Sequence, residues 1–131
     1  MTTTITKWKK GHEFTSYLDH NSIEIDGDRK NGFGPKALLL SAVAACSAID
    51  IVEILGKMRV GFSDFEIEIS AGQTEEHPRV FTDIFIHYRM KSKQANEEKI
   101  RKAIDLSLEK YCGVSAMLRK NSPIHYQLEL H

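Results

Sequence analysis

The two cysteines, Cys46 and Cys112, are the residues of this chain whose type is best suited to covalent chemistry. A thiolate is a nucleophile that can be oxidised and restored, whereas a buried thiol behaves as a small apolar side chain. The two positions are too far apart for a C-x-x-C metal or redox motif. Each cysteine, taken alone, is therefore open to two interpretations: a packing residue or a reactive thiol.

The local surroundings of the two cysteines differ. Cys46 lies among Ala, Leu and Ile residues of a long apolar run, which favours packing. Cys112 directly precedes a short predicted helix, where unpaired N–H groups and the helix dipole would stabilise a thiolate. Local physics by itself therefore favours Cys112 as the more acidic thiol.

The apolar run around Cys46 predicts a long central helix, and the rest of the chain is organised around it. Pro35 suits the first helical position, because its fixed φ is already helical. From Ala37 to Leu55, 15 of 19 residues are apolar, and the exceptions are Ser41, Ser47, Asp50 and Glu53. Such a helix, running to about Met58, has no polar stripe and is expected to be buried on nearly all sides. A chain this short cannot cover it alone, so we expect a partner subunit.

A transmembrane helix is the alternative interpretation of the same run. Asp50 and Glu53 would then lie at bilayer depth, where each charge costs about 2.5 kcal/mol or more. The sequence therefore favours a buried helix of a soluble protein, and no membrane partner is expected.

Composition describes an ordinary globular chain. It has 131 residues, 41% of them hydrophobic and 27% charged, and its 18 basic and 18 acidic residues give a formal net charge of zero. We expect one domain over residues 1–131. Interspersed charges give no reason to expect a nucleic-acid partner. The N-terminus lacks the apolar segment of a signal peptide, so the expected location is cytoplasmic, where thiols stay reduced.

The remaining elements are predicted from periodicity. Alternation of apolar and polar residues predicts strands, and an apolar stripe at helical spacing predicts helices. The predicted buried stripe of the second helix comprises Ile100, Ala103, Ile104, Ser107, Leu108 and Tyr111. The fold class is α+β with antiparallel sheet. The expected order is a β-meander over 3–26, the central helix, strands over 64–71 and 80–90, helices over 96–110 and to about 120, and a strand over 124–130.

Phosphate-binding, metal-binding and serine-hydrolase motifs are not found in the sequence. The loop 26–34 is rich in Gly, Asn and Asp but has neither phosphate-binding glycine pattern. The six histidines show no metal-ligand spacing, so no metal site is predicted. No G-x-S-x-G string occurs either.

Two strings together resemble the OsmC/Ohr family of osmotically inducible and organic-hydroperoxide-resistance proteins. The first is the helix segment 35–52, which contains Ala-Cys-Ser-Ala-Ile-Asp-Ile-Val around Cys46. The second is Glu-Lys-Tyr-Cys at 109–112. The resemblance covers nearly the whole chain and looks closer to an uncharacterised OsmC-like branch than to the well-studied OsmC and Ohr peroxidases.

The resemblance implies an OsmC-like fold in which antiparallel sheets wrap the long central helices of an intertwined homodimer. It also implies thiol-dependent reduction of organic hydroperoxides as an oxidative-stress defence. Cys46 would be the peroxidatic thiol and Cys112 the resolving thiol, which closes a disulfide with it. No cofactor is implied beyond an external dithiol reductant.

Three further residues are possible supporting members of that site. Asp50 and Glu53 follow Cys46 by four and seven positions, so they share roughly its helical face. Arg29 is the only early arginine, whereas the peroxidase branches hold the reactive thiolate with an arginine. Lys36 and Ala37 stand where those branches carry a glutamate. The alternative functions are a non-catalytic dimer that binds an apolar small molecule and a thiol redox sensor.

Overall fold

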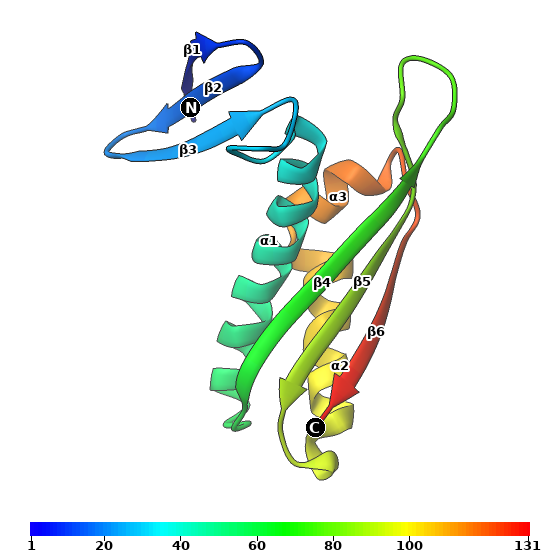
Figure 1. Ribbon diagram of the computed structural model, residues 1–131. Helices are drawn as coiled ribbons and strands as arrows, with labels where there is room; N and C mark the ends of the chain where they lie inside the picture. Colours follow the sequence, from blue (N-terminus) through cyan, green and yellow to red (C-terminus); the bar gives the residue numbers. More distant parts are fainter. The chain divides into compact units, whose positions relative to one another are not determined.

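The computed structural model describes residues 1–131 and comprises two compact units, Met1–Leu39 and Leu40–His131 (Figure 1). The expected order of strands and helices is confirmed. The single domain over 1–131 stays a prediction. The elements are β1 (Ile5–Lys10), β2 (Glu13–Leu18), β3 (Asn21–Asp26), α1 (Pro35–Lys57), β4 (Ser63–Gln73), β5 (Phe81–Lys91), η1 (Gln94–Asn96), α2 (Glu97–Leu106), η2 (Ser107–Tyr111), α3 (Gly113–Arg119) and β6 (Ile124–Leu130).

The N-terminal unit contains the predicted meander. Strands β1, β2 and β3 pair antiparallel in that order, with Trp8 opposite Phe14 and Phe14 opposite Ile25. Tight turns at Gly11 and at Asp19, both with positive φ, connect the strands. Most of the side chains in this sheet are exposed within the unit.

Asp26 organises the loop that follows the meander. Its carboxylate accepts N–H groups from Asp28 at 2.8 Å, Lys30 at 3.1 Å and Asn31 at 3.0 Å. These bonds, that from Asn31 foremost, hold the pKa of Asp26 below its ordinary value. Arg29 lies within this loop at φ 57°. One side chain therefore fixes the backbone around Arg29.

Helix α1 begins at Pro35, as predicted, and presents one buried stripe. Val43, Ser47, Ile51 and Leu55, spaced four residues apart, are buried. The opposite side is open: Ile49 is 66% and Val52 47% exposed. A single chain thus covers one face of a helix that is apolar on all faces. By length and composition alone α1 is a candidate membrane span, a test that core helices of soluble proteins also pass.

The second sheet has the order β4-β5-β6 and corrects one expectation. Strands β4 and β5 form the predicted antiparallel pair, but β6 runs parallel to β5, with Tyr126 opposite Ile86. The chain between β5 and β6 runs through α2, η2 and α3, and this helical crossover returns it to the starting end of β5. A crossover of that kind makes the next strand parallel.

The core of the C-terminal unit lies between this sheet and the helices on one of its faces (Figure 1). Alternate residues of β5 point inward, which confirms the predicted period of two. Helix α2 contributes its apolar stripe, and its charged residues are exposed or half-buried. The fully buried members are Val43, Ile51, Leu55, Ile84, Ile86, Tyr88, Met90, Ile100, Ala103 and Ile104.

The predicted second helix is not α-helical up to its end. After Leu106 it widens into η2, a π-turn closed by the N–H of Cys112 donating to the Ser107 carbonyl at 2.7 Å. The wider turn changes the helical phase. Tyr111, expected on the buried stripe, is therefore 53% exposed, which corrects the sequence prediction.

Replacing Asp26 by Asn should loosen the 26–33 loop, because a neutral amide oxygen accepts backbone N–H groups less strongly than a carboxylate. We expect faster hydrogen exchange at the amides of Asp28, Lys30 and Asn31. In the wild type, the same amides should lose protection only below the ordinary aspartate pKa of ~3.9, since the folded-state pKa is lowered. Unchanged exchange in Asp26→Asn would contradict this role.

Candidate active site

Cys46 lies on α1 at the border between the buried stripe and the open side. The next residue, Ser47, is fully buried; its hydroxyl donates to the Ala44 carbonyl at 3.1 Å and accepts from the Tyr88 hydroxyl at 2.8 Å. These bonds fix the rotation of the helix at this turn. Cys46 is thereby left half-buried.

Cys112 lies between the π-turn η2 and helix α3. It is the N-terminal capping residue of α3, and its Sγ accepts the N–H of Ser115 at 3.3 Å. This agrees with the predicted position at a helix start. The side chain is only 3% exposed, so Cys112 is much less accessible than Cys46.

The two thiols are brought together although they lie far apart in the sequence. The Cys112 thiol and the Val114 N–H both lie near enough to the Cys46 thiol to affect its pKa. Burial raises the pKa of Cys46; the Val114 N–H opposes this, whereas Cys112 and the nearby Asp50 carboxylate add to it. None of these groups is a cation. At neutral pH Cys46 is thus held predominantly as the thiol.

Asp50 and Glu53, predicted beside Cys46, have different surroundings. Asp50 accepts the Ser107 hydroxyl at 2.8 Å and contributes to the pKa of Cys46, so it belongs to the thiol site. Glu53 forms an exposed pair with Lys57 at 3.7 Å. Both line a groove of about 590 Å³, together with Ile54, Lys57, Met58, Leu106 and Tyr111.

Arg29 belongs to the N-terminal unit, where its aliphatic stem lies against Gly34. Its guanidinium is on an exposed loop. A role for Arg29 beside Cys46 stays a prediction.

Sequence reasoning assigned no role to the hydroxyl groups around the thiols. Ser107 is fully buried and contacts both Asp50 and the Ser47 carbonyl, and Tyr88 is bound to Ser47. The available signal was a serine on the otherwise apolar stripe of the second predicted helix. A buried hydroxyl needs a partner, which indicates a polar contact with another element.

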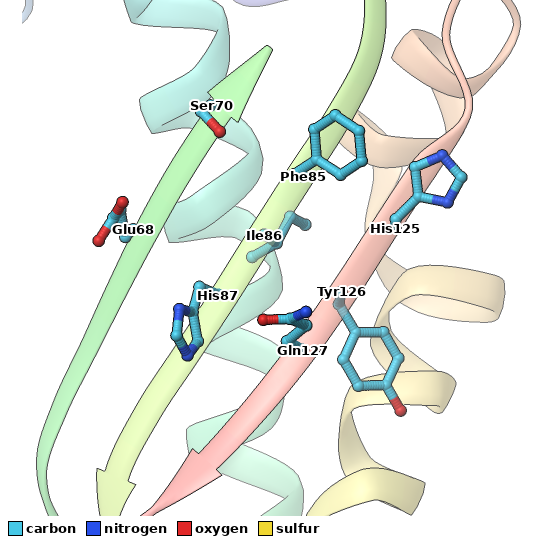
Figure 2. A pocket seen from close by; sticks show the side chains of 8 residues that line it. All are labelled: Glu68, Ser70, Phe85, Ile86, His87, His125, Tyr126 and Gln127. Atoms are coloured by element: carbon cyan, nitrogen blue, oxygen red, sulfur yellow. The ribbon is translucent and has the colours of Figure 1, made fainter.

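A second hollow, of about 470 Å³, lies on the other face of the β4-β5-β6 sheet (Figure 2). Phe85 and His125 stack there with ring centroids 5.2 Å apart. Each outward histidine has a carboxylate partner: His125 contacts Asp83 at 2.9 Å and His87 contacts Glu129 at 3.2 Å. Cys46 and Cys112 lie on the helical side of the sheet, so this hollow is separate from the two thiols.

The chain belongs to the OsmC-like protein family, whose model matches residues 19–127. Protein YhfA of Escherichia coli K12 is 35% identical over 126 residues, covering 95% of this chain and 94% of YhfA.

Solved structures show the same fold. An OsmC-like protein from Mycoplasma pneumoniae aligns with a TM-score of 0.87 at 20% identity, over 99% of this chain and 96% of that one. The organic hydroperoxide resistance protein OhrB of Bacillus subtilis aligns with a TM-score of 0.66 at 18% identity, over 98% of each chain. The α+β class and the family resemblance inferred from the two cysteine strings are confirmed.

Replacing Asp50 by Asn should lower the pKa of Cys46, because it removes a nearby negative charge that opposes the thiolate. The alkylation rate of Cys46 by iodoacetamide, followed by mass spectrometry, should rise at pH 7. At pH values well above the pKa it should match the wild type. Glu53→Gln is the matched control, and its pH profile should shift less. Equal profiles for Asp50→Asn and wild type would contradict the assignment.

Proposed function

We propose that this protein reduces organic hydroperoxides with Cys46 as the peroxidatic and Cys112 as the resolving thiol. The observation that carries the proposal is that these two thiols, 66 residues apart in the sequence, lie near each other in the fold. Both cysteines are free, as the first step of the proposed reaction requires. The Bacillus subtilis protein of the same fold is named for organic hydroperoxide resistance, which supports a role in oxidative-stress defence.

The proposed reaction has three steps. The Cys46 thiolate attacks one peroxide oxygen, the O–O bond breaks, and the other oxygen takes a proton and leaves as an alcohol. Cys46 is now a sulfenic acid. Cys112 attacks that sulfur, the S–S bond forms, and the hydroxyl leaves as water with the thiol proton. An external dithiol then reduces the disulfide by exchange and becomes a disulfide itself.

Accessibility supports these roles. A peroxide must reach the first thiol, and Cys46 is half-buried whereas Cys112 is 3% exposed. The position of Cys112 at the start of a helix, taken alone, favours Cys112 as the more acidic thiol. A capping thiol that is almost fully enclosed suits attack on a neighbouring sulfur better than attack on a molecule from solution.

The surroundings of Cys46 favour organic substrates over hydrogen peroxide. The groove that shares Asp50 with the thiol site is lined in part by the apolar residues Ile54, Met58 and Leu106. An apolar group gains by leaving water for such a surface. We propose no cofactor, because the two thiols and an external dithiol account for every electron transferred.

The active form that we propose is a cytoplasmic homodimer. Ile49 and Val52 are exposed on the open side of α1, and a second copy offers the same apolar surface. Burying such side chains stabilises by roughly 1.5–3 kcal/mol each. A reducing compartment keeps both cysteines free between turnovers.

A thiol redox sensor is the second candidate, because two free cysteines that lie near each other suit a reversible disulfide as well as a catalytic one. In a sensor the Cys46–Cys112 disulfide would form reversibly without sustained consumption of peroxide.

Titration of the reduced protein with cumene hydroperoxide tests the proposal, with free thiols and peroxide counted together. We expect two thiols lost per peroxide in the wild type and restoration by a dithiol. Cys46→Ser should abolish consumption. Cys112→Ser should consume one equivalent and then over-oxidise. Equal multi-turnover rates in all three proteins would exclude the mechanism, and a reversible disulfide without turnover would select the sensor.

Sedimentation tests the dimer. The wild type should sediment as a dimer at low micromolar concentration, and Ile49→Glu should raise the dissociation constant by about a hundredfold or more, because two apolar contacts are lost per dimer. Phe85→Glu, on the far face of the second sheet, is the matched control and should stay dimeric. A folded wild-type monomer would refute the assembly.

A further inference from the structure

We propose that Ser107 is a positioning residue that holds Cys112 against Cys46 by fixing the π-turn η2 to helix α1. The inference deepens the proposed function, since it concerns the step in which Cys112 attacks the Cys46 sulfur. The contacts that carry it exist in the reduced protein without any peroxide.

The first contact sets the backbone of Cys112. The carbonyl of Ser107 accepts the Cys112 N–H at 2.7 Å, a bond that spans five residues and closes the π-turn. An α-helical turn would instead join that N–H to the carbonyl of Leu108. The choice between the two registers determines where the Cys112 side chain points.

The second set of contacts engages the Leu108 carbonyl, which is the acceptor that an α-helical turn would use for the Cys112 N–H. The Leu108 carbonyl accepts a bond from the Arg119 guanidinium and lies 3.3 Å from the Ser115 hydroxyl, which also reaches the Cys112 carbonyl at 3.0 Å. Because Ser115 and Arg119 belong to the segment that follows Cys112, they tie α3 to the π-turn. The wider register is thereby held from both sides.

The third contact joins this turn to the helix that carries Cys46. The Ser107 hydroxyl donates to Asp50 Oδ2 at 2.8 Å and lies 3.3 Å from the Ser47 carbonyl oxygen. Ser47 directly follows Cys46, and Asp50 lies about one turn further along α1. Ser107 is fully buried, so water does not replace these partners. Ser107 thus binds the backbone of Cys112 through its carbonyl, and it binds helix α1, which carries Cys46, through its hydroxyl.

The proposal is tested by the closing rate of the disulfide, measured with dithiobisnitrobenzoate. Thiolate attack on this aromatic disulfide gives a protein mixed disulfide and releases one arylthiolate. The second protein thiol then attacks the protein sulfur of the mixed disulfide, loses its proton, forms the S–S bond and displaces a second arylthiolate. This second release is a first-order step, and its rate reports how well Cys112 is placed.

Ser107→Ala should slow the second release about fivefold to tenfold, because one buried hydrogen bond to a carboxylate is lost. Ser122→Ala is the matched control: it removes another buried serine hydroxyl, one that donates to the Phe81 carbonyl. It should leave the rate unchanged even if it lowers the melting temperature equally. Equal rates in the two variants would overturn the proposal, as would a wild type that releases only one arylthiolate.

The variant Asp50→Asn distinguishes the effect of the hydrogen bond to Ser107 from the effect of the negative charge of Asp50. The amide oxygen can still accept the Ser107 hydroxyl, so the second release should stay well above that of Ser107→Ala when the two are compared at a pH where thiol ionisation is matched. A rate as low as that of Ser107→Ala would overturn the geometric argument. Failure of the proposed function is distinguishable, because a wild type that releases both arylthiolates but leaves cumene hydroperoxide intact loses only the peroxidase role.

Discussion

Helix α1 imposes the constraint on which the rest of the structure depends: its apolar surface is larger than one chain covers. The stripe from Val43 to Leu55 packs against the second sheet and α2, while Ile49 and Val52 on the other side remain exposed. Cys46 stands at the border between these two regions. The same helix therefore contributes to the core of the C-terminal unit, exposes apolar side chains on its other side, and leaves the Cys46 thiol partly accessible.

Buried hydroxyl groups fix how the helices meet around that thiol. Ser47, Tyr88 and Ser107 are enclosed, and each must find a hydrogen-bond partner because an unpaired buried polar group is costly. Tyr88 bonds to Ser47, and Ser107 bonds to Asp50. These contacts admit one rotation of α1 and one register of the π-turn. An entirely apolar contact would leave both much less defined.

The raised pKa of Cys46 and its partial exposure have opposite effects on the reactivity of this thiol. Burial raises the pKa of Cys46, and the carboxylate of Asp50 acts in the same direction. Because the thiolate is the reactive form of a cysteine, both effects lower the reactivity of Cys46 while its partial exposure leaves it accessible.

The sequence by itself determined the elements, because local periodicity records which face of a strand or helix is buried. It also determined the family through the strings around Cys46 and Cys112, and from the apolar run it predicted a partner subunit. Tertiary contacts alone set the parallel direction of β6, the π-turn that exposes Tyr111, and the hydroxyl contacts around the two thiols. Each of these depends on contacts between residues distant in the chain, such as Ser107 with Asp50, and no local pattern encodes them.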